Sequence, residues 1–596
     1  MNILKKQNRI YLAAVMGAFL FYACSDNFLE QPALGALDNE VVTNTSGVQK
    51  LLIGAYGALD GQQDADNALG GGGPWEAAPD NWVYGTVAGG EASKGSFGGD
   101  QPAIDQIVKF ISNPTNGYYN TKWKALYEGV ARCNNTLRIL GNVEDISDAE
   151  RLNVEAQAKF LRGHYYFELK KMWNMVPYID ENTEDPQQPN DMDIWPMIEA
   201  DFQFAYDNLP PTQAEFARAN KWAAGAYLGK TLLYQQKFAE AREVFNTVIA
   251  SGVNSGGTKY DLIPFFKDNF DAATENNAET VFDIQMVAND GTSTITNSNQ
   301  GGKLNFPYNS PFRCCGFYQP SQDLMNSYKT NEDTGLPDID NYNQNPVKND
   351  MGLTVDQAFT PYEGSLDPRA DWTIGRRGIP YHDWGNHPGI AWIREQSYGG
   401  PFAPKKNIYR QATQDIYADQ SSWAPGTALN VHIIRFADVL LMGAEAEAQT
   451  GNLNAALDYV NRVRERAGNE DGFLKEYLND ANPMGGFNED QDAANYNISP
   501  YTASQFSSQE QALEAIYFER KLELAMEGHR FFDLVRWGIA EETLNAYFDY
   551  QGAITTDVRG GNFISGKSEY YPIPQAQIDL STGASGEPTL IQNPGY

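Results

Sequence analysis

Three groups of aromatic and polar residues lie in stretches of the chain that are rich in Gly, Pro and Asn. Flat rings beside hydrogen-bonding side chains suit a sugar, because a sugar has apolar C–H faces edged by hydroxyl groups. The first group lies in the loop at residues 60–101, the second lies around Phe312 and the third around Trp392. Their members are Trp75, Asp80, Asn81, Trp82 and Tyr84; Phe306, Tyr308, Phe312, Arg313, Phe317 and Tyr318; and Trp384, Trp392, Arg394 and Tyr398.

Each of these rings has an alternative role in a local core that anchors a long loop. For any single residue the two roles carry equal weight. For the groups taken together ligand contact is favoured, because loops held on a rigid scaffold often carry function. We therefore predict that at least one group contacts a bound ligand.

Residues 561–568 match the phosphate-binding pattern G-x-x-x-x-G-K-S. That pattern binds phosphate only where a strand enters the loop and a helix leaves it. Pro572 and Pro574 follow within a few residues and exclude such a helix. We interpret the match as coincidence.

The sequence gives little support for a metal site or a catalytic motif. His382 and His387 flank Asp383 in a Gly- and Pro-bearing loop without the Glu of an H-E-x-x-H zinc site, so loop-ordering hydrogen bonds are favoured. Two loops rich in Asp and Asn, at residues 333–341 and 488–495, leave room for a structural calcium ion, although neither fits an EF-hand. Because no G-x-S-x-G elbow or local Cys–His pairing occurs, we predict a protein without catalytic residues, metal or cofactor.

The 596-residue chain carries a formal net charge of −33. Such an acidic surface repels phosphate backbones, which argues against nucleic acid as a partner. Aromatic residues make up 12% of the chain, and Trp and Tyr beyond the needs of a core often mark recognition surfaces.

The N-terminus has the layout of a secretory signal peptide. Two lysines and an arginine precede an apolar segment at residues 10–23, which is too short to cross a hydrocarbon core of roughly 30 Å. Cys24 follows the small residue Ala23, where bacterial lipoprotein signals carry the thiol that receives lipid. We predict a signal peptide at residues 1–23 and a lipidated tether at residues 24–36. The alternative is an ordinary signal peptide with a chance cysteine.

Four cysteines occur in the chain: Cys24, Cys133, Cys314 and Cys315. With Cys24 lipidated they cannot form a disulfide framework, so stability must come from packing. The adjacent Cys314 and Cys315 could form a vicinal disulfide or remain two free thiols. Chelation of an ion with one further ligand is less favoured.

Helical periodicity dominates two parts of the chain, at residues 118–249 and 436–548. Residues 222–249 form a predicted helical hairpin with small and aromatic residues at tetratricopeptide spacings, and residues 436–464 form a second copy. Residues 280–287 alternate enough for a short strand. We predict a mainly α fold, in which a tetratricopeptide-like helical-hairpin solenoid packs against an irregular, loop-rich, ligand-binding part with few short strands.

Composition divides the mature chain into four further parts. They are an N-terminal helical part at residues 37–260, a loop-rich insertion and expected ligand face at 261–430, a C-terminal helical part at 431–548, and an irregular C-terminal segment at 549–596.

Several motifs resemble the SusD/RagB family of Bacteroidetes outer-membrane nutrient-binding lipoproteins. Two helical motifs carry most of the resemblance, RFADVLLMGAEA from Arg435 and ERKLELAMEGHRFFDLVRWG from Glu519. The segments YPIP from Tyr571 and QNPGY from Gln592 resemble the family's C-terminal region, and CSDNFLE from Cys24 resembles its N-terminus. The resemblance covers nearly the whole mature chain in order.

The resemblance implies a cell-surface protein that is attached to the outer membrane only through its lipid. It also implies that the protein binds an oligosaccharide and delivers it to a SusC-like TonB-dependent transporter. Ligand residues vary within the family, so the motifs do not identify the glycan. The alternatives are a surface glycoside hydrolase and a peptide-binding or structural surface protein.

Glu519, Glu523 and Glu527 recur every fourth residue in the second motif. Like charges at this spacing repel on a helix, and buried charges are normally paired, so we expect cations to neutralise them rather than a catalytic role. The candidate partners are Arg435, Arg520, Arg530 and Arg536.

Overall fold

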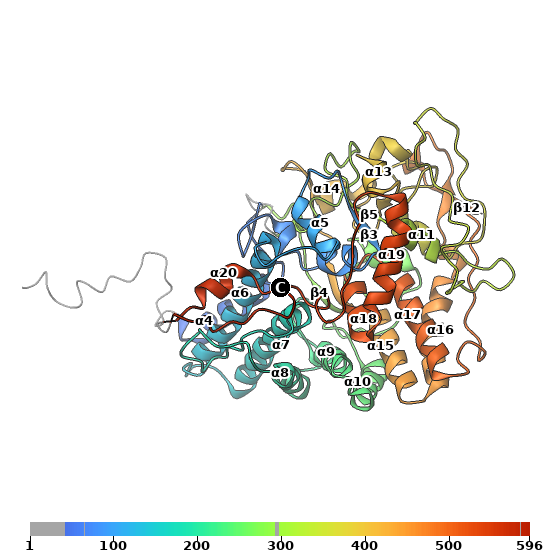
Figure 1. Ribbon diagram of the computed structural model, residues 1–596. Coiled ribbons are helices and arrows are strands. Elements are labelled where there is room, and N and C mark those ends of the chain that lie inside the picture. Colours follow the sequence, from blue (N-terminus) through green and yellow to red (C-terminus); the bar gives the residue numbers. More distant parts are fainter. Residues whose placement is uncertain (1–41, 65, 292–296, 584–585) are drawn as a thin grey trace, which may run out of the picture.

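The longer helices pack side by side in helical pairs across the lower half of the molecule as drawn in Figure 1. The computed structural model describes residues 42–64, 66–291, 297–583 and 586–596. The predicted signal peptide, Cys24 and the tether lie outside these residues. The loop-rich middle of the chain lies above the helices in Figure 1. Long helices and only short strands make up the regular structure, which confirms the predicted mainly α fold.

The N-terminal helices form the first series. They are α4 (Thr45–Gly57), α5 (Pro102–Val108), α6 (Gly117–Leu140), α7 (Asp148–Trp173), α8 (Trp195–Asn208), α9 (Lys221–Tyr234) and α10 (Phe238–Ser251). Side chains cap several of their N-termini, as where Asn220 accepts a hydrogen bond from the Ala223 amide. The predicted hairpin of α9 and α10 is confirmed. At Gly229 a Cβ would lie 2.7 Å from the Phe245 ring, so the close approach of these two helices requires a glycine.

The C-terminal helices form the second series: α15 (Phe436–Gln449), α16 (Leu453–Ala467), α17 (Gln509–Glu523), α18 (Arg530–Trp537), α19 (Ala540–Ile554) and α20 (Gln575–Leu580). The hairpin of α15 and α16 confirms the second predicted copy. Asn246 of α10 donates to Glu447 of α15 at 2.7 Å and accepts from Tyr459 of α16 at 2.8 Å. The two series therefore pack into one helical body.

Among the described residues, the strands form six two-stranded antiparallel sheets. The pairs are β1 (Gln62–Asp64) with β2 (Asn67–Ala68), β3 (Ala92–Gly95) with β5 (Phe317–Pro320), β4 (Thr280–Ile284) with β10 (Val431–Arg435), β6 (Ile374–Gly375) with β7 (Ala403–Pro404), β8 (Ala418–Asp419) with β9 (Gly426–Thr427), and β11 (Lys475–Tyr477) with β12 (Phe487–Asp492). The strand predicted at residues 280–287 is β4. Its partner β10 leads directly into α15, so this sheet joins the loop-rich part to the second helical series.

Short helical segments complete the loop-rich part. They are α11 (Gln322–Ser327), α12 (Ala370–Thr373), α13 (Gln396–Gly399) and α14 (Gln414–Tyr417), with single turns at η1 (Pro74–Glu76), η3 (Phe266–Phe270), η4 (Gly389–Trp392), η5 (Gln411–Thr413), η6 (Glu470–Gly472) and η7 (Pro483–Gly485), and a π-helical turn at η2 (Trp82–Val87).

A buried ion-pair network neutralises the three glutamates of the second motif. Glu519 pairs with Arg369 and Arg464, and Glu523 pairs with Arg369, Arg435 and Arg466. Arg435 also pairs with Glu527, together with Lys406. The structural role is therefore supported, because each carboxylate is paired.

The predicted partners in this network were mostly wrong. Of the four candidates only Arg435 pairs with these glutamates. Arg520 pairs with Asp438 and Asp533, and Arg536 pairs with Glu445 and Asp533. Helix α17 also ends at Glu523, so Glu527 lies beyond the helix rather than on its face.

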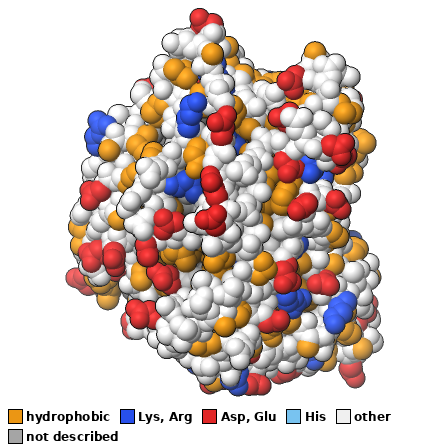
Figure 2. Space-filling view, turned by 90° about the vertical axis from the view of Figure 1, so that its right-hand side faces the viewer, with side chains coloured by type: hydrophobic (Ala, Val, Ile, Leu, Met, Phe, Trp, Pro, Cys, Tyr) orange, Lys and Arg blue, Asp and Glu red, His pale blue; other side chains and the backbone are white. Residues whose placement is uncertain are grey.

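Acidic side chains are scattered over the face drawn in Figure 2 and outnumber Lys and Arg there. This agrees with the net charge of −33. Within the described residues, no helix is both long enough and apolar enough to cross a membrane.

Candidate functional site

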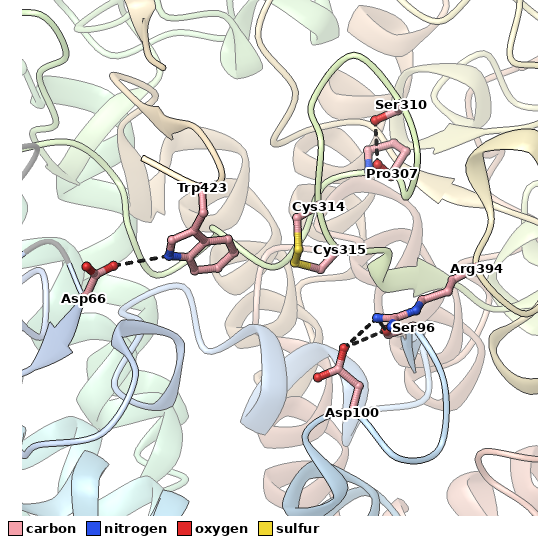
Figure 3. The surroundings of a disulfide bond; sticks show 9 residues. All are labelled: Asp66, Ser96, Asp100, Pro307, Ser310, Cys314, Cys315, Arg394 and Trp423. Atoms are coloured by element: carbon pink, nitrogen blue, oxygen red, sulfur yellow. Dashed lines mark hydrogen bonds and ion pairs between the residues drawn. A yellow bond between two sulfur atoms is a disulfide. The ribbon is translucent and has the colours of Figure 1, made fainter. Parts of the chain in front are cut away.

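Trp423 is the most exposed tryptophan in the described part of the chain, with 44% of its surface accessible. It lies in the turn between β8 and β9. Its indole Nε1 donates to the Asp66 carboxylate at 3.4 Å, as Figure 3 shows, and the Lys303 ammonium lies 4.7 Å from the ring centroid. Trp75 meets it edge to face, with ring centroids 6.3 Å apart. An exposed ring held on several sides is suited to stacking on a ligand.

The turn that carries Trp423 is fixed by two cations. Arg313 donates to the carbonyl oxygens of Gln420 at 3.2 Å and Ser422 at 2.7 Å. Lys303 donates to the Ser422 hydroxyl at 2.8 Å and pairs with Asp66 at 3.3 Å. A binding surface that is ordered before the ligand arrives loses less conformational entropy on binding.

A second cluster is centred on the exposed side chain of Arg394. Its guanidinium lies 4.2 Å from the Phe97 ring centroid and 5.1 Å from that of Tyr308, so the two rings flank the cation. Arg394 also donates to the Ser96 hydroxyl and the Asp100 carboxylate, each at 2.9 Å. The side chains of Phe97 and Tyr308 are half-buried, which leaves part of each ring accessible.

The segment 313–316 connects these two clusters. Arg313 holds the Trp423 turn, and at Gly316 a Cβ would lie 3.7 Å from the Arg394 Cβ and 3.0 Å from that of Tyr308. Cys314 and Cys315 lie between them and form a disulfide, which decides between the alternatives left open by the sequence. In Figure 3 the disulfide lies between Trp423 and Arg394.

We call this surface the Trp423 face and define it by Asp66, Trp75, Phe97, Asp100, Tyr308, Cys314, Arg394 and Trp423. It combines flat rings, an apolar disulfide, carboxylate acceptors and a guanidinium donor. Asp66 has 65% of its side-chain surface exposed, so its remaining oxygen lone pairs are accessible to hydroxyl groups. These are the features that sugar recognition requires.

Most of the first predicted group belongs to the core. Trp82 and Tyr84 are 0% and 1% exposed, and the Tyr84 hydroxyl donates to the carbonyl oxygens of Glu76 and Tyr118. Asn81 is buried and donates to Glu168 at 2.9 Å. The burial of Asn81, Trp82 and Tyr84 corrects their assignment as candidate ligand contacts. The π-helical turn η2 draws its side chains inward, and only Trp75 lies on the Trp423 face.

Asp80 lies beside this core. Its carboxylate accepts a hydrogen bond from the Trp82 amide at 3.2 Å, and burial raises its pKa to about 6. This hydrogen bond holds the start of η2 in place.

The second predicted group divides in the same way. Phe312 is fully buried and stacks on Phe306, while Tyr318 is 4% exposed and donates to Thr86 and to the Met526 carbonyl oxygen. Both are anchors of the loop, which corrects their assignment as ligand contacts. Arg313 is exposed and holds the Trp423 turn.

The third group is mostly a local core. Trp384 and Trp392 are half-buried and meet Phe312 edge to face, and the Trp384 indole donates to the Tyr409 carbonyl oxygen at 2.9 Å. Tyr398 is 7% exposed and donates to Asp105. Arg394 alone of this group lies on the Trp423 face.

Both histidines of the loop at 382–387 form hydrogen bonds that order the loop. The His382 ring bonds the Lys405 carbonyl oxygen, and His387 accepts from the Gly389 amide. Burial lowers the pKa of His387 to about 3. In the described parts of the chain, no group of three or more His, Cys, Asp and Glu side chains could hold a metal ion. The loop-ordering role is confirmed.

The phosphate-binding pattern also lacks its structural context. Residues 561–568 follow the end of α19 and are succeeded by irregular chain up to α20. Lys567 extends toward the ring of Tyr596, with its ammonium 4.7 Å from the centroid. The prediction that no helix leaves this segment is confirmed.

Two hollows lie away from the Trp423 face. One of about 420 Å³ lies between α6 and the C-terminal segment, and one of about 560 Å³ lies between α17 and α19. Glu510, Glu514 and Glu542 line the second hollow beside Arg530. Neither hollow has the combination of exposed ring and fixed polar groups that Trp423 presents.

Trp423, Phe97, Asp66 and Asp100 were not predicted from the sequence. Trp423 stands alone among Ser, Pro and Gly residues, whereas each predicted group contains several rings. A single tryptophan in a short polar turn was the signal that could have found it.

Comparison with known proteins agrees with this architecture. The model of the SusD family matches residues 278–596, which is more than half of the chain. The chain belongs to the SusD family. A second model, described as starch-binding associating with outer membrane, matches residues 64–233.

Individual relatives of this SusD family member have low sequence identity to it, but the similarity extends over most of the chain. A SusD-like protein P2 from Formosa agariphila is 24% identical over 82% of this chain and 83% of its own length. The starch-binding protein SusD from Bacteroides thetaiotaomicron is 22% identical over 77% of this chain and 75% of its own.

Solved structures show the same fold. A SusD superfamily protein from Bacteroides vulgatus superposes with a TM-score of 0.66 at 22% identity, covering 92% of this chain and 99% of the other. The surface glycan-binding protein A from Bacteroides thetaiotaomicron, solved in complex with laminarihexaose, has a TM-score of 0.63 at 22% identity, with the same coverage.

Proposed function

We propose that this protein is a non-enzymatic glycan-binding lipoprotein of the outer-membrane surface. It binds an oligosaccharide at the Trp423 face and delivers it to a SusC-like TonB-dependent transporter. The observation that carries the binding role is Trp423, an exposed ring held by Trp75, Asp66 and Lys303. Membership of the SusD family supports the outer-membrane location and the transporter partner.

Binding is favoured over hydrolysis by the carboxylates of this face. A glycosidase needs two carboxyl groups about 5–9 Å apart, one of them able to donate a proton. Asp66 is committed to Lys303 and the Trp423 indole, and Asp100 to Arg394. Carboxylate oxygens held by cations in this way are positioned to accept hydrogen bonds from sugar hydroxyls.

A calorimetric titration of the purified protein against a panel of oligosaccharides tests this function. Loss of the Trp423 ring removes an apolar contact worth about 1.5–3 kcal/mol, so Trp423→Ala should weaken binding by roughly 10- to 150-fold. Phe216→Ala is the matched control, because Phe216 is also exposed (41%) but lies between α8 and α9. Equal affinity of wild type and Trp423→Ala would contradict the assignment.

Three further experiments test the remaining parts of the proposal, which are the lack of hydrolysis, the lipid anchor and the transporter partner. Chromatography of the glycan after prolonged incubation should show no shorter products, and their release would establish a hydrolase. Cys24→Ala should move the protein out of the membrane fraction and abolish incorporation of labelled fatty acid. Cys133→Ala, which removes a buried thiol in α6, is the control for that variant. Co-purification with a TonB-dependent transporter from solubilised outer membrane tests the partner.

A further inference from the structure

We propose that the disulfide between Cys314 and Cys315 is itself a sugar-contacting surface and fixes the spacing between the Trp423 and Arg394 clusters. This inference rests on the proposed glycan binding at the Trp423 face. It assigns a ligand-binding role to a disulfide, a bond whose usual role in proteins is to stabilise the fold.

The disulfide lies at the end of a closed loop. The Gly316 amide donates to the Phe306 carbonyl oxygen at 2.8 Å, so residues 307–315 leave the body of the protein and return to the same place. Phe312 anchors this loop by inserting into a cluster of buried rings, where it stacks on Phe306 and meets Tyr409 edge to face. The loop is therefore fixed to the body on the side opposite the solvent.

Each residue that flanks the disulfide holds a different part of the face. On one side, Arg313 donates to two carbonyl oxygens of the turn that carries Trp423. On the other side, Gly316 lies against the Cβ atoms of Tyr308 and Arg394 and accepts a hydrogen bond from the Ser96 amide. The disulfide closes a small covalent ring between these two contacts, so the ends cannot shift independently.

The sulfur atoms are also placed to contact a ligand. Cys314 is half-buried and Cys315 is 5% exposed, so the surface that this pair presents to a ligand belongs mainly to Cys314. Sulfur is polarisable and apolar, and it makes favourable contacts with flat hydrophobic groups. A sugar presents such a surface in the C–H groups of its ring face. Figure 3 shows the pair between the Trp423 ring and the Arg394 guanidinium. On this proposal, a chain of sugars that touches both residues also touches the disulfide.

The first test compares affinities for the glycan that binds best in the panel. The double variant Cys314→Ala, Cys315→Ala should lose about 3- to 30-fold in affinity, and Cys133→Ala should lose none, because Cys133 is a buried free thiol in α6. Tris(2-carboxyethyl)phosphine should weaken wild-type binding to the level of the double variant. In that reaction water supplies the oxygen atom of the phosphine oxide and the two protons of the thiols, while the phosphine is oxidised and the disulfide is reduced. The reductant should leave the double variant unchanged.

The second test separates contact from positioning. Arg313→Ala releases the Trp423 turn without touching the sulfurs. If the disulfide contacts the sugar, reduction should weaken the Arg313→Ala variant by a similar factor as the wild type. If reduction has no further effect in that variant, the disulfide acts only through Trp423 and the contact role is overturned.

The outcomes distinguish this inference from the proposed function. If Trp423→Ala loses binding while reduced and oxidised proteins bind equally, the disulfide role is wrong and the glycan-binding function stands. If the wild type binds no glycan, both are overturned. Thermal unfolding of each variant confirms that the fold is retained.

Discussion

Trp75 and Trp423 meet edge to face, with ring centroids 6.3 Å apart and an interplanar angle of 79°. Trp75 belongs to the single turn η1 near the N-terminus, and Trp423 to the turn between β8 and β9. Trp75 is half-buried, while Trp423 is 44% exposed. The Trp75 ring therefore supports the Trp423 ring, and the Trp423 ring presents its surface to the solvent.

Removing the supporting ring should weaken binding less than removing the exposed one. Edge-to-face aromatic pairs contribute about 0.5–1.5 kcal/mol beyond their buried area, so Trp75→Leu should reduce glycan affinity by roughly 2- to 10-fold. The leucine keeps an apolar side chain at the position. Calorimetric titration of both variants checks the order, and a larger loss for Trp75→Leu than for Trp423→Ala would contradict it.

Trp82 should affect folding rather than binding. It is fully buried and meets Phe317 and Tyr318 edge to face, so Trp82→Ala should lower the free energy of unfolding by about 3–5 kcal/mol. Trp423→Ala should leave the unfolding midpoint nearly unchanged, because its ring packs mainly at the surface. Thermal unfolding followed by circular dichroism measures both. Equal midpoints for wild type and Trp82→Ala would show that the site is not a core position.

The contrast between these tryptophans also shows what the sequence could predict. Helical hairpins have a periodic pattern, so α9, α10, α15 and α16 were found within a few residues of their observed ends. Trp82 and Trp75 lie in the same Gly-rich loop, and no local signal distinguishes a ring that turns inward from one that turns outward. The π-helical turn that buries Trp82 depends on contacts with β5 and with Gly528, far away in the sequence.

The ion-pair network shows the same limit. Three acidic residues at regular spacing predicted that cations would be present, which is a local inference from charge repulsion. The observed partners come from other segments of the chain and are Arg369, Arg464 and Arg466. Long-range packing decides which arginines lie beside the glutamates. Nearby arginines of the same motif pair elsewhere, as Arg520 does with Asp438.

Breaking this network should be costly. Arg369 is 1% exposed and contacts Asp367, Glu519 and Glu523, so Arg369→Met removes the cation that pairs with the buried Asp367 and one of the cations that pair with Glu519 and Glu523. Removal of one partner of a buried pair costs about 3–5 kcal/mol. Arg132→Met is the matched control, because Arg132 and Glu128 form a pair on the surface of α6 worth about 0–1 kcal/mol. Chemical unfolding of the two variants should give clearly different losses, and similar losses would contradict the network's role.

His432 should make stability depend on pH in a defined window. Burial opposes its charged form, but the Asp283 carboxylate at 2.9 Å outweighs burial and raises the pKa of His432 to about 9. In the unfolded chain the pKa of histidine is about 6.5. The folded state therefore binds this proton more tightly. Its contribution, on the order of 3 kcal/mol, is complete below pH ~6.5 and is lost as the pH rises through 9.

The variant His432→Gln should consequently be less stable than the wild type at pH 6, and the difference should shrink toward pH 9.5. His164 provides a control of opposite sign, because burial lowers its pKa to about 4. Its contribution is complete above pH ~6.5 and is lost as the pH falls toward 4, so His164→Gln should differ from wild type by a constant amount above pH 7. Unfolding free energies measured from pH 4 to 9.5 separate the two windows. A His432→Gln difference that does not change between pH 6 and 9.5 would show that the ion pair with Asp283 does not hold the proton.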